Sequence, residues 1–165
     1  MQSERHPQPA PGVRPARSQD VAWMLTLWTA MMAEHARQDP AFALAEDAER
    51  IWQQSMWDIM ARPDSFVLVA EPYGFCCGWV SRHPAIYLAR EVGLLSEICV
   101  ASGAQRQGVG RALMEAAKDW FISRDVDDFQ LATAMFNHRA QRFFRAMGGR
   151  PLLMRYHFEL GAKNA

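Results

Sequence analysis

The feature that most constrains this chain is the glycine-containing run from Gln105 to Met114, QRQGVGRALM. It stands between a predicted strand, Glu91 to Ala101, and a helix predicted from Val109 onwards by apolar residues spaced three and four apart. Glycines at 108 and 110 let the backbone turn sharply and bring several N–H groups together at a helix start, where the helix dipole is positive. The run therefore predicts a phosphate-binding turn between a strand and a helix.

Two common phosphate-binding loops fit this run poorly. A Walker-type loop needs Lys followed by Ser or Thr after its second glycine, whereas Arg111 and Ala112 follow Gly110 here. A dinucleotide-binding loop needs a third small residue where Leu113 stands, and it usually opens the first strand-helix unit of a chain. About a hundred residues precede this run, so its ligand has to be inferred from the surrounding sequence.

The rest of the chain alternates between helical and extended patterns. Two amphipathic helices are expected first, one capped by Ser18 and one ending near Pro63. A helix capped by Asn137 and stopped by Gly148-Gly149 is expected near the end. Strands are expected over residues 13–17, 65–70, 75–82, 91–101 and 129–134, with a last strand pair over 150–160.

The strand over 91–101 carries apolar side chains on both faces, which is typical of a central strand covered on both sides. Its two faces are expected to carry Leu94, Ile98 and Val100 on one side and Leu95, Glu97 and Cys99 on the other. The strand at 129–134 is expected to lie parallel to it, because a helical crossover connects them.

Composition limits the remaining classes of protein. Half of the 165 residues are hydrophobic and 22% are charged, which indicates one domain over residues 13–165 after a disordered tail, 1–12. Eighteen basic residues balance eighteen acidic ones, which argues against a nucleic-acid partner. No apolar stretch approaches the ~18 residues of a membrane span. Cys76, Cys77 and Cys99 suit neither a disulfide framework nor a zinc site, so we expect reduced thiols, a cytoplasmic protein and no metal.

Two motifs then identify a candidate family. The strand ending in Glu97-Ile98-Cys99-Val100 is followed by Q-x-x-G-x-G at 105–110, and N-x-x-A-x-x-F-F-x-x-x-G follows from Asn137 to Gly148. At this separation the two motifs resemble the GNAT superfamily of acetyl-CoA-dependent N-acetyltransferases. The resemblance implies an α/β fold with a mixed central β-sheet, splayed between strands 4 and 5 and flanked by about four α-helices.

The resemblance also implies which residues bind acetyl-CoA. In this family the cofactor's pyrophosphate lies on the glycine loop, here Gln105, Arg106, Gln107, Gly108, Val109, Gly110 and Arg111. The pantetheine arm pairs with the preceding strand as if it were another strand, here at Ile98, Cys99 and Val100. Asn137 matches the position that hydrogen-bonds this arm, with a plain helix N-cap as the alternative.

Acetyl transfer to an amine requires a base, a donor to the thioester oxygen and a proton for the leaving thiolate. We expect Glu97 to be the base, because a carboxylate on a central strand is desolvated; a structural pair with an arginine is the alternative. The resemblance gives the donor's role to the backbone N–H of Cys99 or Val100. Phe144 stands where many members carry a tyrosine acid, so Tyr156, water or an unassisted thiolate has to serve instead.

The sequence thus predicts an N-acetyltransferase that moves acetyl directly from acetyl-CoA to a primary amine of a small molecule or peptide. Because Phe144 replaces the usual acid, the alternative is a non-catalytic acetyl-CoA-binding sensor or regulatory module. No nucleic acid or membrane partner is expected. Pairing of exposed final strands into a homodimer is a further implication of the resemblance.

Overall fold

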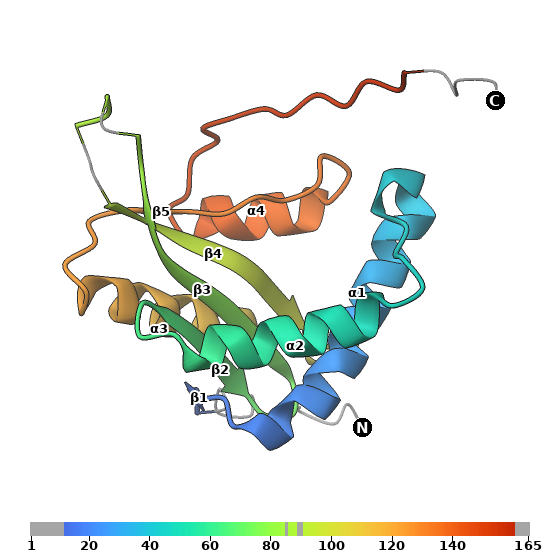
Figure 1. The fold of residues 1–165 in the computed structure, drawn as a ribbon, viewed down its shortest axis with the longest axis horizontal. Helices are drawn as coiled ribbons and strands as arrows, with labels where there is room; N and C mark the ends of the chain where they lie inside the picture. The colour runs from blue at the N-terminus through green and yellow to red at the C-terminus, as the bar shows by residue number, and fades with distance from the viewer. Residues whose placement is uncertain (1–11, 85, 89–90, 161–165) are drawn as a thin grey trace, which may run out of the picture.

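The computed structural model describes residues 12–84, 86–88 and 91–160, so the tail predicted over 1–12 lies almost wholly outside the described residues. Within these residues, four α-helices flank a five-stranded sheet (Figure 1). The helices are α1 (Val21–Gln38), α2 (Ala48–Ala61), α3 (Val109–Ile122) and α4 (His138–Ala146). The strands are β1 (Arg14–Pro15), β2 (Ser65–Ala70), β3 (Gly74–Arg82), β4 (Glu91–Val100) and β5 (Phe129–Gln130). Short 3-10 turns are η1 (Ser18–Asp20), η2 (Pro40–Phe42) and η3 (Ser102–Ala104).

The strands follow the chain in the order β1-β2-β3-β4-β5. The first four pair antiparallel, and β5 runs parallel to β4 after the α3 crossover. Only Gly93 with Phe129 and Leu94 with Gln130 join β4 to β5, so β4 has no β5 partner beyond Leu94. The predicted mixed sheet, splayed between its fourth and fifth strands, is confirmed.

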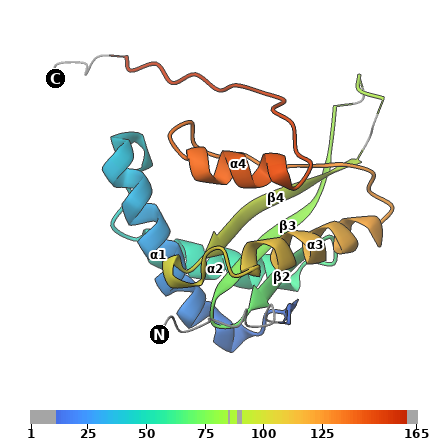
Figure 2. The same cartoon turned by 180° about the vertical axis from the view of Figure 1, so that it is seen from behind.

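Two layers of apolar side chains cover the sheet. On one face α1 and α2 pack against it, with Met24, Trp28 and Trp52 in the buried cluster. On the other face α3 contributes Leu113 and Phe121, and α4 packs partly buried side chains against the same cluster. The reverse view shows α3 lying across the sheet (Figure 2). Within the described ranges, no helix is long and apolar enough to cross a membrane.

Helices and strands whose apolar residues form a continuous face were predicted with nearly correct boundaries. Strand β2 covers the predicted residues 65–70, and α2 ends at Ala61, two residues before Pro63. Helix α3 begins at Val109 as expected, and Gly148 ends α4 with a left-handed φ of 91°. These boundaries depend on local residues alone, which is why the sequence predicted them.

The N-terminal start differs from the prediction. The strand expected over 13–17 is only Arg14–Pro15, and Ser18 begins a 3-10 turn rather than capping α1. The buried carboxylate of Asp20 instead accepts from the backbone N–H of Arg17 at 2.7 Å and from Arg14 at 2.7 and 3.0 Å. The acid, not the serine, therefore organises this turn.

Two predicted strands near the C-terminus are also corrected. The strand expected over 129–134 contains only Phe129–Gln130, because the chain leaves the sheet where β4 and β5 diverge. The strand pair expected over 150–160 is not formed: residues 151–160 are an exposed segment with no strand partner among the described residues. Both views show it running outward past α4 (Figures 1 and 2).

Candidate functional site

The glycine loop joins the end of β4 to the start of α3. After η3 the chain turns through Arg106, with φ of 64°, and Gly108, with φ of 86°, and Gly108 is the N-cap of α3. Within the part of the chain that the structure describes, the N–H groups of 105–111 have no hydrogen-bond acceptor. Free donors at a helix start suit an anionic ligand, and the phosphate site at this loop stays a prediction.

Side chains of the loop hold it in this shape. Gln105 donates to the carbonyl of Val100 at 3.4 Å and accepts from the guanidinium of Arg139. Gln107 donates to the carbonyl of Gly103 at 2.9 Å. These contacts use only the side chains of the two glutamines, and their backbone N–H groups have no acceptor among the described residues. The contact from Arg139 was not predicted, since its helical pattern gives no sign of a partner 34 residues away.

Beyond Leu94, β4 presents an edge that β5 does not cover. The predicted pantetheine-binding residues, Ile98, Cys99 and Val100, lie on this stretch, next to the glycine loop. The structure therefore brings the predicted strand contacts and the predicted phosphate loop to one end of the opening between β4 and β5.

A bulge on β4 corrects the predicted division of its faces. Cys77 pairs with Glu97, whereas the next residue of β3 pairs with Leu95, so Ser96 is the extra residue. The bulge places Leu95 with Ile98 and Val100 against the α3 cluster, while Cys99 lies in the cluster of α1 and α2. The predicted faces assumed that side chains alternate strictly from Leu94 onwards, and such an assumption cannot reveal a bulge.

Glu97 lies in an aromatic environment on the α1 and α2 side of the sheet. The Nε1 group of Trp52 donates to both carboxylate oxygens of Glu97 at 3.1 Å. Trp52 stacks on Trp28 with centroids 5.2 Å apart and meets Phe75 edge-on at 5.7 Å. Desolvation by this burial raises the pKa of Glu97 from its usual 4.5 to about 6, although the Trp52 hydrogen bond opposes the rise.

The surroundings of Glu97 bear on both of its predicted roles. Among the described residues, no arginine lies within ion-pair distance of its carboxylate, and the alternative of a structural pair stays untested for the others. The predicted desolvation and raised pKa are confirmed. The contact of Trp52 with Glu97 joins α2 to β4 across 45 residues, so no local sequence pattern indicates it.

The other predicted residues lie in different surroundings. The thiol of Cys99 is buried, contacts the carbonyl of Leu27 at 3.6 Å and has its pKa raised to about 12 by burial, so it stays neutral. Asn137 caps α4 by accepting from the N–H of Ala140 at 3.0 Å. Phe144 is half-buried against the α3 cluster, where its ring supplies no proton.

Tyr156 does not lie with the glycine loop, the end of β4 or Glu97. It is 72% exposed and lies on the segment that leaves α4. Arg106 and Arg111 are also exposed, at the surface of the glycine loop. In the described ranges no group of three His, Cys, Asp or Glu side chains is placed to hold a metal ion.

Residues 28–148 match the sequence profile of the acetyltransferase (GNAT) family. The chain belongs to this family. An uncharacterized N-acetyltransferase of Archaeoglobus fulgidus is 27% identical over 110 residues, which span 65% of this chain and 72% of that protein.

Solved structures share the GNAT fold of this chain. A tetramutant of the BH1408 protein from Bacillus halodurans superposes with a TM-score of 0.77 at 22% identity, covering 90% of this chain and 99% of the other. The aminoglycoside 6'-N-acetyltransferase AAC(6')-IG from Acinetobacter haemolyticus gives a TM-score of 0.70 at 18% identity, covering 92% and 99%. At these identities the likeness establishes the fold.

Membership of the GNAT family makes the protein an acetyl-CoA-dependent acyltransferase by class. The free N–H groups at the start of α3 and the uncovered stretch of β4 are the features of this chain that fit such a cosubstrate.

Proposed function

We propose that this GNAT protein transfers an acetyl group from acetyl-CoA directly to a primary amine of a small molecule or peptide, in a ternary complex. The observation that carries the proposal is the position of Glu97. Its carboxylate is half-buried, accepts from the Nε1 group of Trp52, and lies on the strand that leads into the loop of free N–H groups. A desolvated acid beside a phosphate-binding loop suits proton removal from a bound amine.

Each residue then has a distinct task. The N–H groups of 105–111 hold the pyrophosphate, and the backbone of Ile98 to Val100 pairs with the pantetheine arm. Arg106, exposed beside the loop, adds positive charge near the phosphates. The backbone N–H of Cys99 or Val100 donates to the thioester oxygen as negative charge develops there.

Proton transfer centres on Glu97. An alkylammonium has a pKa near ~10 and carries no lone pair, so one proton has to leave before attack; Glu97 accepts it. The amine nitrogen then bonds to the carbonyl carbon as the carbon–sulfur bond breaks. Because Phe144 has no O–H and Tyr156 is exposed, water accepts the second proton of the nitrogen and passes a proton to the departing thiolate.

The acceptor is a cation near an aromatic lining. Trp52 contacts the carboxylate of Glu97 and itself meets the rings of Trp28 and Phe75, so a negative charge lies beside an aromatic group that attracts an ammonium ion. AAC(6')-IG, which has this fold, is by name an aminoglycoside acetyltransferase, so aminoglycosides belong in the amine panel. The free cysteines accord with a reducing cytoplasm as the location.

The experiment has a binding arm and a turnover arm. Acetyl-CoA and CoA should raise the melting temperature, and thiol release against a panel of primary amines should identify acceptors. Gly108→Val, at the left-handed N-cap, should abolish the shift, because the side chain strains the turn that aims the N–H groups. Gly103→Ala is the matched control, since nothing lies within 4 Å of its added Cβ.

The outcomes separate the alternatives. No shift with wild-type protein would contradict acetyl-CoA binding altogether. A shift without thiol release across the panel would support the non-catalytic sensor that the replacement of tyrosine by Phe144 suggests. A shift that survives Gly108→Val would contradict the role of the loop.

A further inference from the structure

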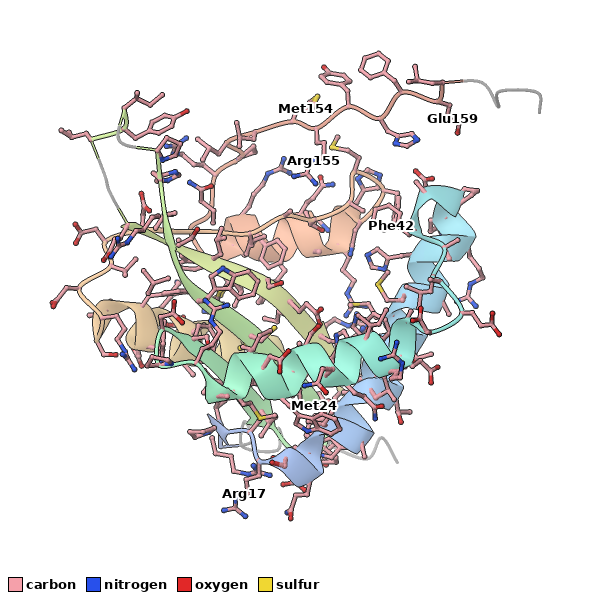
Figure 3. The ribbon with its side chains drawn as sticks, in the orientation of Figure 1. Arg17, Met24, Phe42, Met154, Arg155 and Glu159 are labelled. Carbon is pink, nitrogen blue, oxygen red and sulfur yellow. The ribbon has the colours of Figure 1, made fainter. Side chains whose placement is uncertain are left out.

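Three aromatic rings meet where the end of α1 faces the start of α4. His35 lies in the last turn of α1, Phe42 ends the η2 turn, and Phe136 precedes Asn137, the N-cap of α4. The imidazole meets Phe42 edge-on with centroids 5.5 Å apart and Phe136 at 5.4 Å, and the two phenyl rings are 5.6 Å apart. Figures 1 and 2 show the two helix ends facing each other, and Phe42 lies on the side of α1 that faces α4 (Figure 3).

The hydrogen bonding of His35 fixes which ring nitrogen is open to a ligand. Nδ1 lies 2.8 Å from the backbone carbonyl oxygen of Met31, and a carbonyl only accepts, so Nδ1 donates. In the neutral imidazole the second nitrogen, Nε2, is then an acceptor. Nε2 has no hydrogen-bond partner among the described residues, and no buried side-chain nitrogen or oxygen of those residues is left unpaired. It follows that Nε2 is accessible to solvent.

The neighbouring rings hold the imidazole in one orientation. His35, Phe42 and Phe136 are each half-buried and come from three separate segments of the chain. Edge-on packing against two rings, together with the Nδ1 hydrogen bond, restricts rotation of the imidazole. A group that is already oriented binds its partner at a lower entropic cost than a mobile one. His35 therefore presents Nε2 as a preorganised acceptor.

One face of α1 leads from His35 to the candidate base. Trp28 and His35 are seven residues apart, which is two turns and about 10 Å along the helix. Trp28 stacks on Trp52, and Trp52 donates to Glu97. Between Trp28 and His35, Met31 packs partly buried against the cluster of α1 and α2. His35 thus lies at one end of an apolar helix face whose other end is beside Glu97.

We propose that His35 is a specificity-determining residue of the acceptor site, which takes an elongated primary amine with a second O–H or N–H group roughly 10 Å from the reactive nitrogen. The inference rests on the proposed function, because Glu97 has to receive the amine. Nε2 of His35 accepts a hydrogen bond from the second group, and the apolar stem of the acceptor lies along the α1 face at Met31. A simple alkylamine of the same length displaces water from Nε2 without replacing its hydrogen bond.

The test compares amino alcohols with alkylamines of the same chain length, from ethanolamine to aminodecanol, by thiol release from acetyl-CoA. Each amino alcohol has one reactive nitrogen, so the two members of a pair differ only at the far end. In the wild type, kcat/KM should favour the amino alcohol about tenfold once its chain reaches from Glu97 to His35. Ethanolamine, which is too short, should show no such preference.

Variants of His35 show whether Nε2 is the source of the preference. His35→Phe keeps a ring in the cluster without either nitrogen, and His35→Asn keeps a donor near the position of Nδ1; both should lose the preference. His35→Gln places an amide oxygen near the position of Nε2 and should retain most of it. His83→Phe is the matched control, because His83 also packs on a ring, that of Tyr87 at 5.2 Å, but lies between β3 and β4. Acetyl-CoA binding checks that each variant is folded.

The outcomes distinguish the inference from the proposed function. Thiol release with no preference for the long amino alcohols would overturn the inference while acetyl transfer stands. A preference that persists in His35→Phe or His35→Asn would overturn it as well. No thiol release with any amine would contradict the proposed function, and the inference with it.

Discussion

Glu97 shows how one side chain acquires a functional pKa from its surroundings. Burial beside Trp52 raises its pKa from 4.5 to about 6, so the protonated form is favoured in the folded state. Stability from this group is therefore fully present below pH 4.5 and is lost as pH rises through 6. The ionised carboxylate costs the fold about 2 kcal/mol above that range. The site keeps a destabilising acid, as a general base requires.

The first prediction concerns the pH profile of turnover. Because Glu97 accepts a proton only when ionised, the rate should rise with pH through a midpoint near 6. Glu97→Gln should lose this rise and lower kcat by about 10²- to 10⁴-fold, with acetyl-CoA affinity unchanged. Steady-state kinetics across pH and a binding titration measure the two effects. Equal turnover in the variant would remove Glu97 as the base.

The second prediction concerns Trp52. Its N–H lowers the pKa of Glu97, so Trp52→Phe should move the midpoint of the pH profile upward while leaving the high-pH rate nearly unchanged. Trp28→Phe is the matched control, because Trp28 stacks on Trp52 at 5.2 Å without bonding the carboxylate. The same pH titration of kcat measures both. An unmoved midpoint in Trp52→Phe would show that the hydrogen bond does not tune Glu97.

For individual residues, the sequence predicted burial and the direction of a pKa shift better than it predicted hydrogen-bond partners. The place of Glu97 on a central strand was enough to predict its burial and raised pKa. Its bond to Trp52 joins residues 45 positions apart, and that of Gln105 to Arg139 joins residues 34 apart. Such contacts depend on how elements pack across the sheet, which no local pattern contains.

Among the elements, helix α4 supports the third prediction. Asn137→Ala removes the acceptor for the N–H of Ala140 and should lower the free energy of unfolding by about 1 kcal/mol. Asn137→Asp keeps the acceptor and removes the amide donor. If that donor bonds the pantetheine arm, the Asp variant should keep its stability and lose about tenfold in acetyl-CoA affinity. Denaturant unfolding and a binding titration separate the roles; unchanged affinity would leave Asn137 as a cap only.

Helices and strands with both a regular apolar spacing and a clear boundary residue were predicted closely. Irregular features of the strands were not predicted. Helices α2 and α3 and strand β2 follow from apolar spacing and from boundaries such as Pro63 and Gly108. The bulge at Ser96 leaves no such signal in the sequence. It is an extra residue of β4 that has no partner in β3, so it is visible only when the two strands are paired. The bulge decides which side chains of β4 face α1 and α2. This part of the candidate site therefore could not be predicted from the sequence.

Over the whole molecule, the motifs around the glycine loop were sufficient for the fold and the family, because they lie where β4 and β5 diverge. The end of the chain was predicted wrongly as a strand pair. Residues 152–160 do have the alternation of a strand, yet they have no strand partner among the described residues. A pattern specifies that a segment can pair; it does not specify with which edge.

The last prediction concerns the acid stability of the whole fold. The buried carboxylate of Asp20 is bound by Arg14, which also pairs with Glu71, so this group ties β1 and the start of α1 to the β2–β3 turn. Arg14 holds the pKa of Asp20 well below its usual 3.8, so the stabilisation from Asp20 is complete above about pH 4 and declines as pH falls further.

Asp20→Asn should therefore lower the free energy of unfolding by about 3 kcal/mol at pH 7, because Arg14 loses its buried partner. Glu71→Gln, at the exposed end, should have little effect. Denaturant unfolding of the three proteins from pH 7 to pH 2 measures this, and a wild-type advantage that persists undiminished at pH 2 would show that the charge of Asp20 is not its source.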